Sequence, residues 1–247
     1  MCNRVATPRE DEIQGYFDKL SGSLRRLFVV EPFVPYYHVS SFAMPKLPFV
    51  AMDDPDRVAP AMWKFMPERA TIDVFKKYDT ANAKAEEIFE KQTYRKSIAS
   101  SRGIVILKGF FEGMEQPDKT VQPYFIYPAN GDMLMLGCVY SDWHNPELGA
   151  TVRTFSIITT NANLRMAQIH NKKRRMPLVI LPGRMDEWLD NLSPTQIKEM
   201  MQPLPDGYLA DHQVSRDLYK SKVDTNLPSI LDRVSPLQFR GTQETLF

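Results

Sequence analysis

The sequence predicts an α+β fold with a mainly antiparallel sheet, curved or closed into a β-barrel, and with flanking helices. Three observations support this prediction. Strand-like apolar runs crowd the middle of the chain, helical patterns flank them, and no repeat or low-complexity linker divides the 247 residues. Strands grouped together, rather than alternating with helices, favour an antiparallel sheet. We therefore expect a single domain over residues 1–247.

The first predicted helix lies in "PREDEIQGYFDKLSGSL". Its apolar residues recur at helical spacing and share one face, namely Ile13, Tyr16, Phe17 and Leu20. Gly22 follows near its end, where glycine commonly stops a helix. In residues 29–60, short apolar segments are interrupted by proline, which favours edge strands and loops.

The middle of the chain carries the strand signals. "ANAKAEEIFEKQTYRKSIASSR" is helical by propensity, and "GIVILKGFFEG" after it is the clearest strand. "PYFIYPANGDMLMLGCVY" has the pattern of a hairpin, with two apolar strands around an Asn130–Gly131 turn. "TFSIITT" is a further strand.

Short helices close the pattern. We predict a helical turn in "NLRMAQIH", a buried strand in "MPLVILP", and helices in "GRMDEWLDN" and "SPTQIKEMMQPL". In the last of these, Ser193 is the expected cap and Pro194 occupies the first helical position, where proline is favoured.

Composition excludes several classes of protein. Hydrophobic residues make up 43% and charged residues 25%, as in soluble globular proteins. The net charge of +1 shows no global nucleic-acid signature, so any such binding needs a local basic patch. No apolar run approaches the roughly 20 residues that span a bilayer, and "VATPREDEIQ" lacks a signal peptide's apolar stretch. Two cysteines make a disulfide framework improbable, with Cys138 a small buried hydrophobe, so we expect a cytoplasmic protein without a membrane partner.

Cys2 is the first candidate for chemistry. Methionine is commonly trimmed when a small residue follows, and trimming Met1 would leave Cys2 with an α-amine and a thiol on adjacent carbons. These groups titrate near ~8 and ~8.5 in model compounds, so both are partly nucleophilic at neutral pH. The alternative is an accidental, disordered cysteine.

Three other segments hold candidate groups: "TANAKAEE", "KGFFEGME" and "IHNKKRRMPLVILP". Together with "MCNR" they resemble the SRAP family, the SOS response-associated peptidase-like proteins, some of which crosslink to abasic sites in single-stranded DNA. That family opens with Met-Cys-Gly-Arg and carries an Asn-Ala-Arg-x-Glu segment and a Gly-aromatic-aromatic-Glu-Trp strand. It then carries a Thr-rich strand and a His before Arg-Met-Pro. "HQVSRDL", with Asn226 further on, is a weaker match to a Val-Ser-Arg segment.

The chain departs from this pattern at several positions. Asn3 replaces a glycine, Lys84 replaces an arginine and Gly113 replaces a tryptophan. His170 stands about three residues further from Met-Pro than the family pattern, which places an insertion in "NKKRR". Two loops that help to separate DNA strands in the family, here residues 37–42 and 68–79, have also lost their pattern.

The resemblance implies an enzyme that acts on its own N-terminus and on DNA. The ring-opened aldehyde of an abasic site would condense with the amine of Cys2, and the neighbouring thiol would close a thiazolidine, a ring favoured by proximity. The implied catalytic residues are Cys2, Asn82, Glu112 and His170. The implied DNA-binding residues are Arg4, Lys84, Thr159, Lys172, Lys173, Arg174 and Arg175. Single-stranded DNA is the expected partner of a monomeric, nucleoid-associated protein.

Each of these assignments has a structural alternative. The alternative for Glu112 is a strand glutamate that faces solvent, and the alternative for Asn82 is a helix N-cap. His170 could be a loop histidine rather than a proton carrier, and the basic run a solvated face rather than a phosphate track. Because Phe110 and Phe111 alternate across a strand, at most one can face the site. His38, His144 and His212 lack metal-ligand spacing, so no metal or other cofactor is expected.

Three rival functions remain open. A glutamine amidotransferase of the N-terminal nucleophile class also starts Met-Cys-Gly and would use Asn130–Gly131 in an oxyanion hole. A peptidase acting on its own N-terminus is the second rival. A single-strand binding module without catalysis is the third, and retention of Met1 would favour it.

Overall fold

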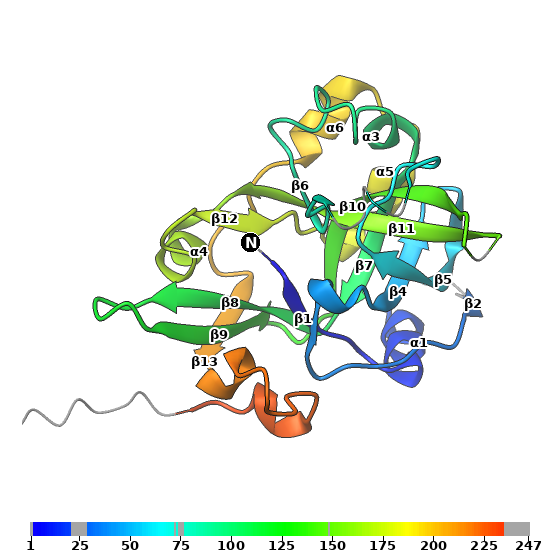
Figure 1. The fold of residues 1–247 in the computed structure, drawn as a ribbon. Helices are drawn as coiled ribbons and strands as arrows, with labels where there is room; N and C mark the ends of the chain where they lie inside the picture. Colours follow the sequence, from blue (N-terminus) through cyan, green and yellow to red (C-terminus); the bar gives the residue numbers. More distant parts are fainter. Residues whose placement is uncertain (1, 21–28, 72, 74–76, 148, 235–247) are drawn as a thin grey trace, which may run out of the picture.

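A closed β-barrel forms the centre of the molecule (Figure 1). The computed structural model describes residues 2–20, 29–71, 73, 77–147 and 149–234. Within these ranges the barrel has the strand order β5-β4-β7-β10-β11, and β11 closes it by pairing in parallel with β5. Its other neighbouring pairs are antiparallel. The bounds are β4 (Lys46–Ala51), β5 (Asp54–Trp63), β7 (Arg102–Leu107), β10 (Leu134–Asn145) and β11 (Ala150–Asn161).

A second, antiparallel sheet lies beside the barrel, with the order β13-β9-β8-β1-β3 in the described residues. Its strands are β1 (Arg4–Ala6), β3 (Val39–Ser40), β8 (Gly109–Glu115), β9 (Val121–Pro128) and β13 (Leu209–Gln213). β1 is an interior strand here, because it pairs with β3 on one side and β8 on the other. β1 is therefore held within this sheet, with the barrel beside it (Figure 1).

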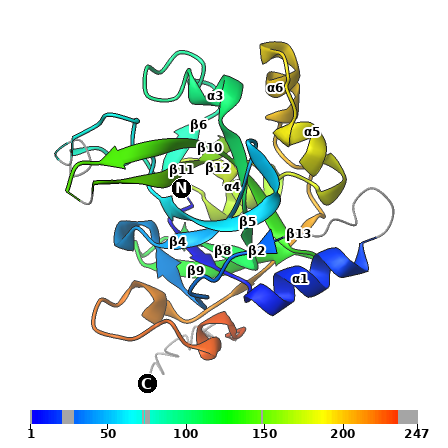
Figure 2. The same ribbon diagram turned by 90° about the vertical axis from the view of Figure 1, so that its right-hand side faces the viewer.

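Short strands and helices cover the barrel. β2 (Val29–Val30) pairs with β5, while β6 (Asn82–Lys84) and β12 (Arg175–Pro177) pair with β11. The α-helices are α1 (Glu10–Lys19), α3 (Ser97–Ser100), α4 (Leu164–Ile169), α5 (Met185–Leu189) and α6 (Pro194–Met200). The 3-10 turns are η2 (Ser41–Ala43), η3 (Pro182–Arg184), η4 (Arg216–Tyr219) and η5 (Pro228–Leu231). Figure 2 shows α1 lying along one side, away from α3 and α6.

Apolar side chains fill both faces of the barrel strands. One core lies between the barrel interior and the second sheet, and contains Trp63, Phe110 and Phe155. The other lies outside the barrel under the helices, and contains Phe17 and Trp188. Burial of each large side chain contributes roughly 1.5–3 kcal/mol, so the fold stands without any disulfide, both cysteines being free.

The predicted α+β fold class is confirmed, but two strand predictions are wrong. "GIVILKGFFEG" is two strands in different sheets, because Lys108 separates β7 of the barrel from β8. The Asn130–Gly131 turn does not join a hairpin. It connects β9 of the second sheet to β10 of the barrel, and these two strands do not pair with each other in the described structure.

The predicted helix over residues 81–102 is also wrong. Its start is β6, which pairs with β11, and only Ser97–Ser100 is α-helical. β4 and β5 are barrel strands rather than edges, with Pro48 opposite Pro60.

The predicted first helix is present as α1, with Ile13 and Phe17 buried, while Gly22 lies outside the described residues. α6 begins as predicted at Pro194, and Ser193 forms a capping box with Gln196. None of the helices in the described ranges combines the length and apolar character that crossing a membrane requires.

Candidate active site

Cys2 lies inside the protein, just ahead of β1, with 2% of its surface exposed. Its backbone carbonyl accepts a hydrogen bond of 3.0 Å from Asn82 Nδ2, which also donates to Asn3 Oδ1 at 2.8 Å. Asn82 is the first residue of β6 and therefore not a helix N-cap. Asn3, which stands where the family has glycine, thus accepts a second hydrogen bond from the same Asn82 side chain that holds Cys2.

Glu112 reaches the same region from β8. The two residues before it, Phe110 and Phe111, are both buried and point to opposite faces of the strand, as expected. Phe110 packs in the core that contains Cys2, and Phe111 packs on the other face against Phe125. Glu112 lies on the Phe110 face and is half-buried. Glu112 is therefore only partly screened from solvent.

His170 ends α4 and is 7% exposed. Its Nδ1 is held by the backbone of Arg175, whose carbonyl oxygen lies 3.0 Å away and whose N–H lies 3.2 Å away. Burial lowers the pKa of the imidazole, and the charge of Glu112 opposes that shift. At neutral pH the ring is therefore mostly uncharged and suited to accept a proton. Because Nδ1 faces the Arg175 backbone, proton exchange would use Nε2.

Electrostatic coupling joins these side chains. Burial raises the pKa of the Cys2 thiol, and the negative charge of Glu112 raises it further. The thiol is thus protonated at neutral pH and needs a base to become a nucleophile. The charge of Glu112 acts on both the Cys2 thiol and the His170 imidazole, while Asn82 holds the backbone of Cys2.

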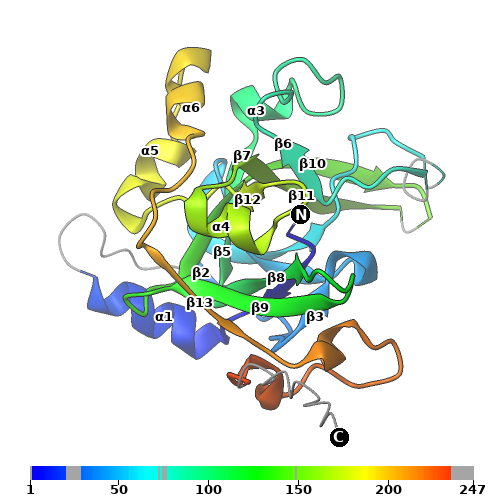
Figure 3. The same cartoon turned by 90° about the vertical axis from the view of Figure 1, so that its left-hand side faces the viewer.

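A pocket of about 580 Å³ opens beside Glu112 and His170. Its remaining lining residues are Gly113, Glu115, Thr120, Val121, Asn171, Lys172, Lys173, Arg216 and Tyr219. Figure 3 shows α4, which His170 follows, lying beside β8, which carries Glu112. Tyr219 was not predicted. Arg216 belongs to "HQVSRDL", so the weak Val-Ser-Arg match is the part of the sequence that could have indicated the side of the pocket formed by Arg216 and Tyr219.

The basic run divides into exposed and buried residues. Lys172, Lys173 and Arg174 are exposed. The loop is docked on β8, since Asn171 Nδ2 donates to the Glu115 carbonyl at 2.8 Å and Lys172 forms an ion pair with the Glu115 carboxylate. This loop therefore forms a wall of the pocket, and Lys173 and Arg174 add exposed positive charge to it.

Arg175 and Thr159 are buried and cannot contact DNA from these positions, which corrects that part of the prediction. Arg175 Nη2 donates to Thr159 Oγ1 at 3.2 Å, and its guanidinium binds Glu86. Lys84 is exposed but paired with Glu87 at 2.8 Å. Arg4 lies over the Tyr219 ring, 4.9 Å from its centroid.

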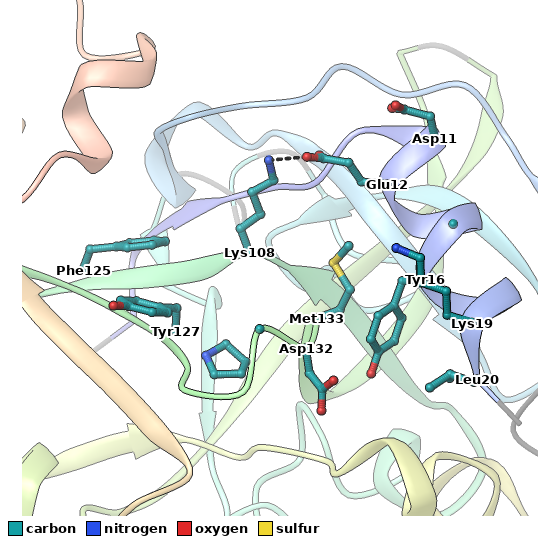
Figure 4. Close-up of a pocket in the computed structure, with 13 residues that line it drawn as sticks. Asp11, Glu12, Tyr16, Lys19, Leu20, Lys108, Phe125, Tyr127, Asp132 and Met133 are labelled. Carbon is teal, nitrogen blue, oxygen red and sulfur yellow. Dashed lines mark hydrogen bonds and ion pairs between the residues drawn. The ribbon is translucent and has the colours of Figure 1, made fainter.

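A larger cavity of about 710 Å³ lies between α1 and the β9–β10 connection (Figure 4). The Lys108–Glu12 ion pair of 2.7 Å lies at one edge of it, and Tyr16 lies across from Tyr127. None of the predicted site residues lines it. Gly131 does, so the Asn130–Gly131 turn belongs to this cavity and not to the Cys2 site, which disfavours an oxyanion role.

Other histidines have structural partners. His38 Nδ1 lies 2.7 Å from Thr225 Oγ1, and burial lowers the pKa of His38 to about 4. His212 Nε2 lies 2.8 Å from the Leu231 carbonyl. Over the described ranges, no three His, Cys, Asp or Glu side chains gather as metal ligands.

The described site thus combines a buried cysteine held by Asn82 with Glu112 and His170 at a lysine-rimmed pocket. The chain belongs to the SOS response associated peptidase (SRAP) family, whose model matches residues 1–221.

Curated relatives and solved structures agree with this membership. Abasic site processing protein YoqW of Bacillus subtilis is 29% identical over 212 residues, covering 83% of this chain and 92% of the relative. Abasic site processing protein YoaM of the same species is 28% identical over 218 residues, covering 87% and 91%. A crystal structure of a Bacteroides thetaiotaomicron protein matches with a TM-score of 0.82 and 26% identity, covering 95% of this chain and all of that one.

Proposed function

We propose that this protein binds single-stranded DNA and joins Cys2 covalently to the ring-opened aldehyde of an abasic site, shielding the lesion. The observation that carries the proposal is the placement of Cys2 near the start of the chain: Asn82 holds its carbonyl oxygen, and the charge of Glu112 acts on both its thiol and the His170 imidazole. The printed names of YoqW and YoaM, both abasic site processing proteins, support the substrate.

The chemistry begins once Met1 is removed. The α-amine of Cys2 adds to the aldehyde carbon and then expels the oxygen as water, which leaves an imine. The thiol sulfur next adds to the same carbon while its proton passes to the imine nitrogen, and a five-membered thiazolidine results. Amine and thiol sit on adjacent carbons, so the second step is intramolecular and fast.

Glu112 and His170 would move the protons. A carboxyl group within reach of the reacting carbon can protonate the departing hydroxyl and then receive a proton back. The raised pKa of the Cys2 thiol means that sulfur enters as S–H, so a base must take its proton before or during addition. Neutral His170 suits that task, and its lowered pKa makes it a weaker candidate for protonating the sugar oxygen.

The DNA strand would pass along the lysine-rimmed wall. Lys172 and Lys173 line the pocket, Arg174 follows them as a further exposed cation, and these three would hold phosphates together with Arg4, which lies over the pocket residue Tyr219. A peptidase or amidotransferase instead needs a thiolate that attacks an amide carbon at neutral pH. A cysteine whose pKa is raised rather than lowered fits that role less well.

An intact-mass experiment tests the proposal. Purified protein is incubated with a single strand that carries one natural abasic site, and in parallel with one that carries a tetrahydrofuran analogue lacking the aldehyde. We expect loss of Met1, and an adduct on the natural site alone that survives denaturation without a reductant. An adduct that appears only after borohydride trapping would mean an imine without ring closure. Retained Met1 with ordinary DNA binding would instead favour a non-catalytic binding module.

A further inference from the structure

Tyr219 occupies the space in which Gly113 has no side chain. A Cβ added to Gly113 would lie 2.7 Å from the Tyr219 hydroxyl oxygen and 2.5 Å from Val121 Cγ1. Both distances are too short for real atoms, so any larger residue at position 113 would displace the tyrosine. Position 113, directly after Glu112, therefore has to be small, because the ring of Tyr219 fills the space beside it. Tyr219 belongs to η4, about 100 residues later in the chain.

The ring is held in place yet remains accessible. Arg4 lies over it at 4.9 Å from the centroid, and Tyr219 is 38% exposed and lines the pocket. Its hydroxyl group keeps its proton at neutral pH, since burial and then the charge of Glu112 raise the pKa of Tyr219 to about 12. An uncharged aromatic ring in a pocket rimmed by lysines suits a nucleobase better than it suits an anion.

Arg4 supplies a second observation. Its Nε atom is buried and has no hydrogen-bond partner among the described residues. Such a buried donor costs free energy unless a ligand satisfies it. The pair thus offers an aromatic surface next to a cation, which is the chemistry that recognises a nucleotide, base and phosphate together.

We propose that Tyr219 is a base-stacking residue, which takes the nucleobase next to the abasic nucleotide while Arg4 meets the adjoining phosphate. The proposal rests on the proposed function, because it assumes that the lesion lies at Glu112 and His170. An abasic nucleotide leaves its neighbouring base without a stacking partner on one side. The ring of Tyr219 replaces that partner, and favours strands whose flanking base is a large purine.

The experiment uses a strand with a tetrahydrofuran site flanked by 2-aminopurine, whose fluorescence falls when it stacks on an aromatic ring. Binding to the whole protein should quench it. Tyr219→Phe should quench equally, whereas Tyr219→Leu should lose the quenching and bind about 5- to 100-fold more weakly, the usual loss for one stacked base. Leu227→Ala is the matched control, because Leu227 is 49% exposed in the same C-terminal segment but does not line the pocket.

Two results would overturn the inference: quenching and affinity unchanged in Tyr219→Leu, or quenching lost equally in Leu227→Ala. Thermal unfolding of each variant shows whether it is folded, and Tyr219→Phe remains informative if Tyr219→Leu is not. Adduct formation on natural abasic DNA is measured in parallel. Quenching without any adduct would refute the proposed function alone, whereas an adduct without quenching would refute the role of Tyr219 alone.

Discussion

Arg175 donates hydrogen bonds to both carboxylate oxygens of Glu86, at 2.6 Å from Nη1 and 2.9 Å from Nη2. The same arginine holds Nδ1 of His170 through its backbone. Glu86 therefore acts on the histidine through Arg175. The glutamate of "NAKAE" and the arginine that ends the basic run are positioning residues for His170, although neither contacts it with its side chain.

Glu86→Gln should weaken this support, lower the rate of adduct formation and destabilise the fold by about 1–2 kcal/mol, because the buried guanidinium loses a charged partner. Partial burial raises the pKa of Glu86, but the hydrogen bonds from Arg175 outweigh it and the pKa lies below the usual 4.5. A lowered pKa means that the contribution to stability is present above pH 4.5 and is lost as pH falls through the folded value. Denaturant unfolding of both proteins from pH 7 to pH 3 checks this.

Glu87→Gln is the matched control, since Glu87 is exposed and pairs with the exposed Lys84 and Lys91. We expect little change in its stability. If the stability gap between wild type and Glu86→Gln stays constant down to pH 3, the ion pair with Arg175 contributes nothing.

Cys2→Ala, Cys2→Ser and any extension ahead of Cys2 should each abolish the stable adduct, because ring closure needs the amine and the thiol together. Binding to undamaged single strands should persist in all three. Denaturing gels report the adduct and fluorescence anisotropy reports the binding. Normal crosslinking by a protein with a tagged N-terminus would refute the mechanism.

Glu112→Gln should slow adduct formation by roughly 100-fold or more, the usual contribution of a positioned general acid-base group. The substitution keeps the shape of the side chain, so unfolding should change little. Single-turnover rates at saturating protein give the comparison. An unchanged rate would show that Glu112 is only structural.

Neutralising Lys173 and Arg174 as glutamines should weaken single-strand binding and flatten its salt dependence. Each phosphate contact adds about −0.7 to the slope of log K against log salt, so losing two should make the slope shallower by roughly 1.4. The saturated crosslinking rate should survive, because the chemistry depends on other residues. Titrations at several salt concentrations, with rates at saturation, provide both readings.

Lys91→Gln with Arg184→Gln is the control pair, as both residues are exposed and lie outside the pocket lining. If the salt dependence of binding flattens equally in this control, the effect comes from the net charge of the protein and not from phosphate contacts at Lys173 and Arg174. Intact binding with a collapsed rate in the Lys173 and Arg174 variant would mean that the loop itself positions His170.

Local patterns predicted the elements that depend on local contacts. The apolar face of α1 and the cap of α6 at Ser193 need only neighbouring residues, and both are present. The alternation along β8 correctly separated Phe110 from Phe111, although both proved to be buried.

The parts of the fold that local patterns did not predict depend on pairing between segments that are distant in the sequence. Helix propensity in residues 85–96 could not compete with the pairing of β6 on β11, a tertiary preference that overrides local tendency. The Asn130–Gly131 turn is present, but the strands on either side of it pair in two different sheets. β9 pairs with β8 and β13, and β10 pairs with β7 and β11. Arg175 appeared basic and exposed in sequence, because only the fold shows that Glu86 lies beside it.

The interior position of β1 also sets an order of events during synthesis. β1 leaves the ribosome about 100 residues ahead of β8, the strand it must join, and such distant pairings form late. The first residues of the chain stay accessible to processing enzymes throughout that delay. Once β1 is inserted, Cys2 is almost completely buried, and a large protease can no longer reach it. For the Met1 removal that the proposed function requires, the topology of the sheet therefore favours the interval before β1 is inserted.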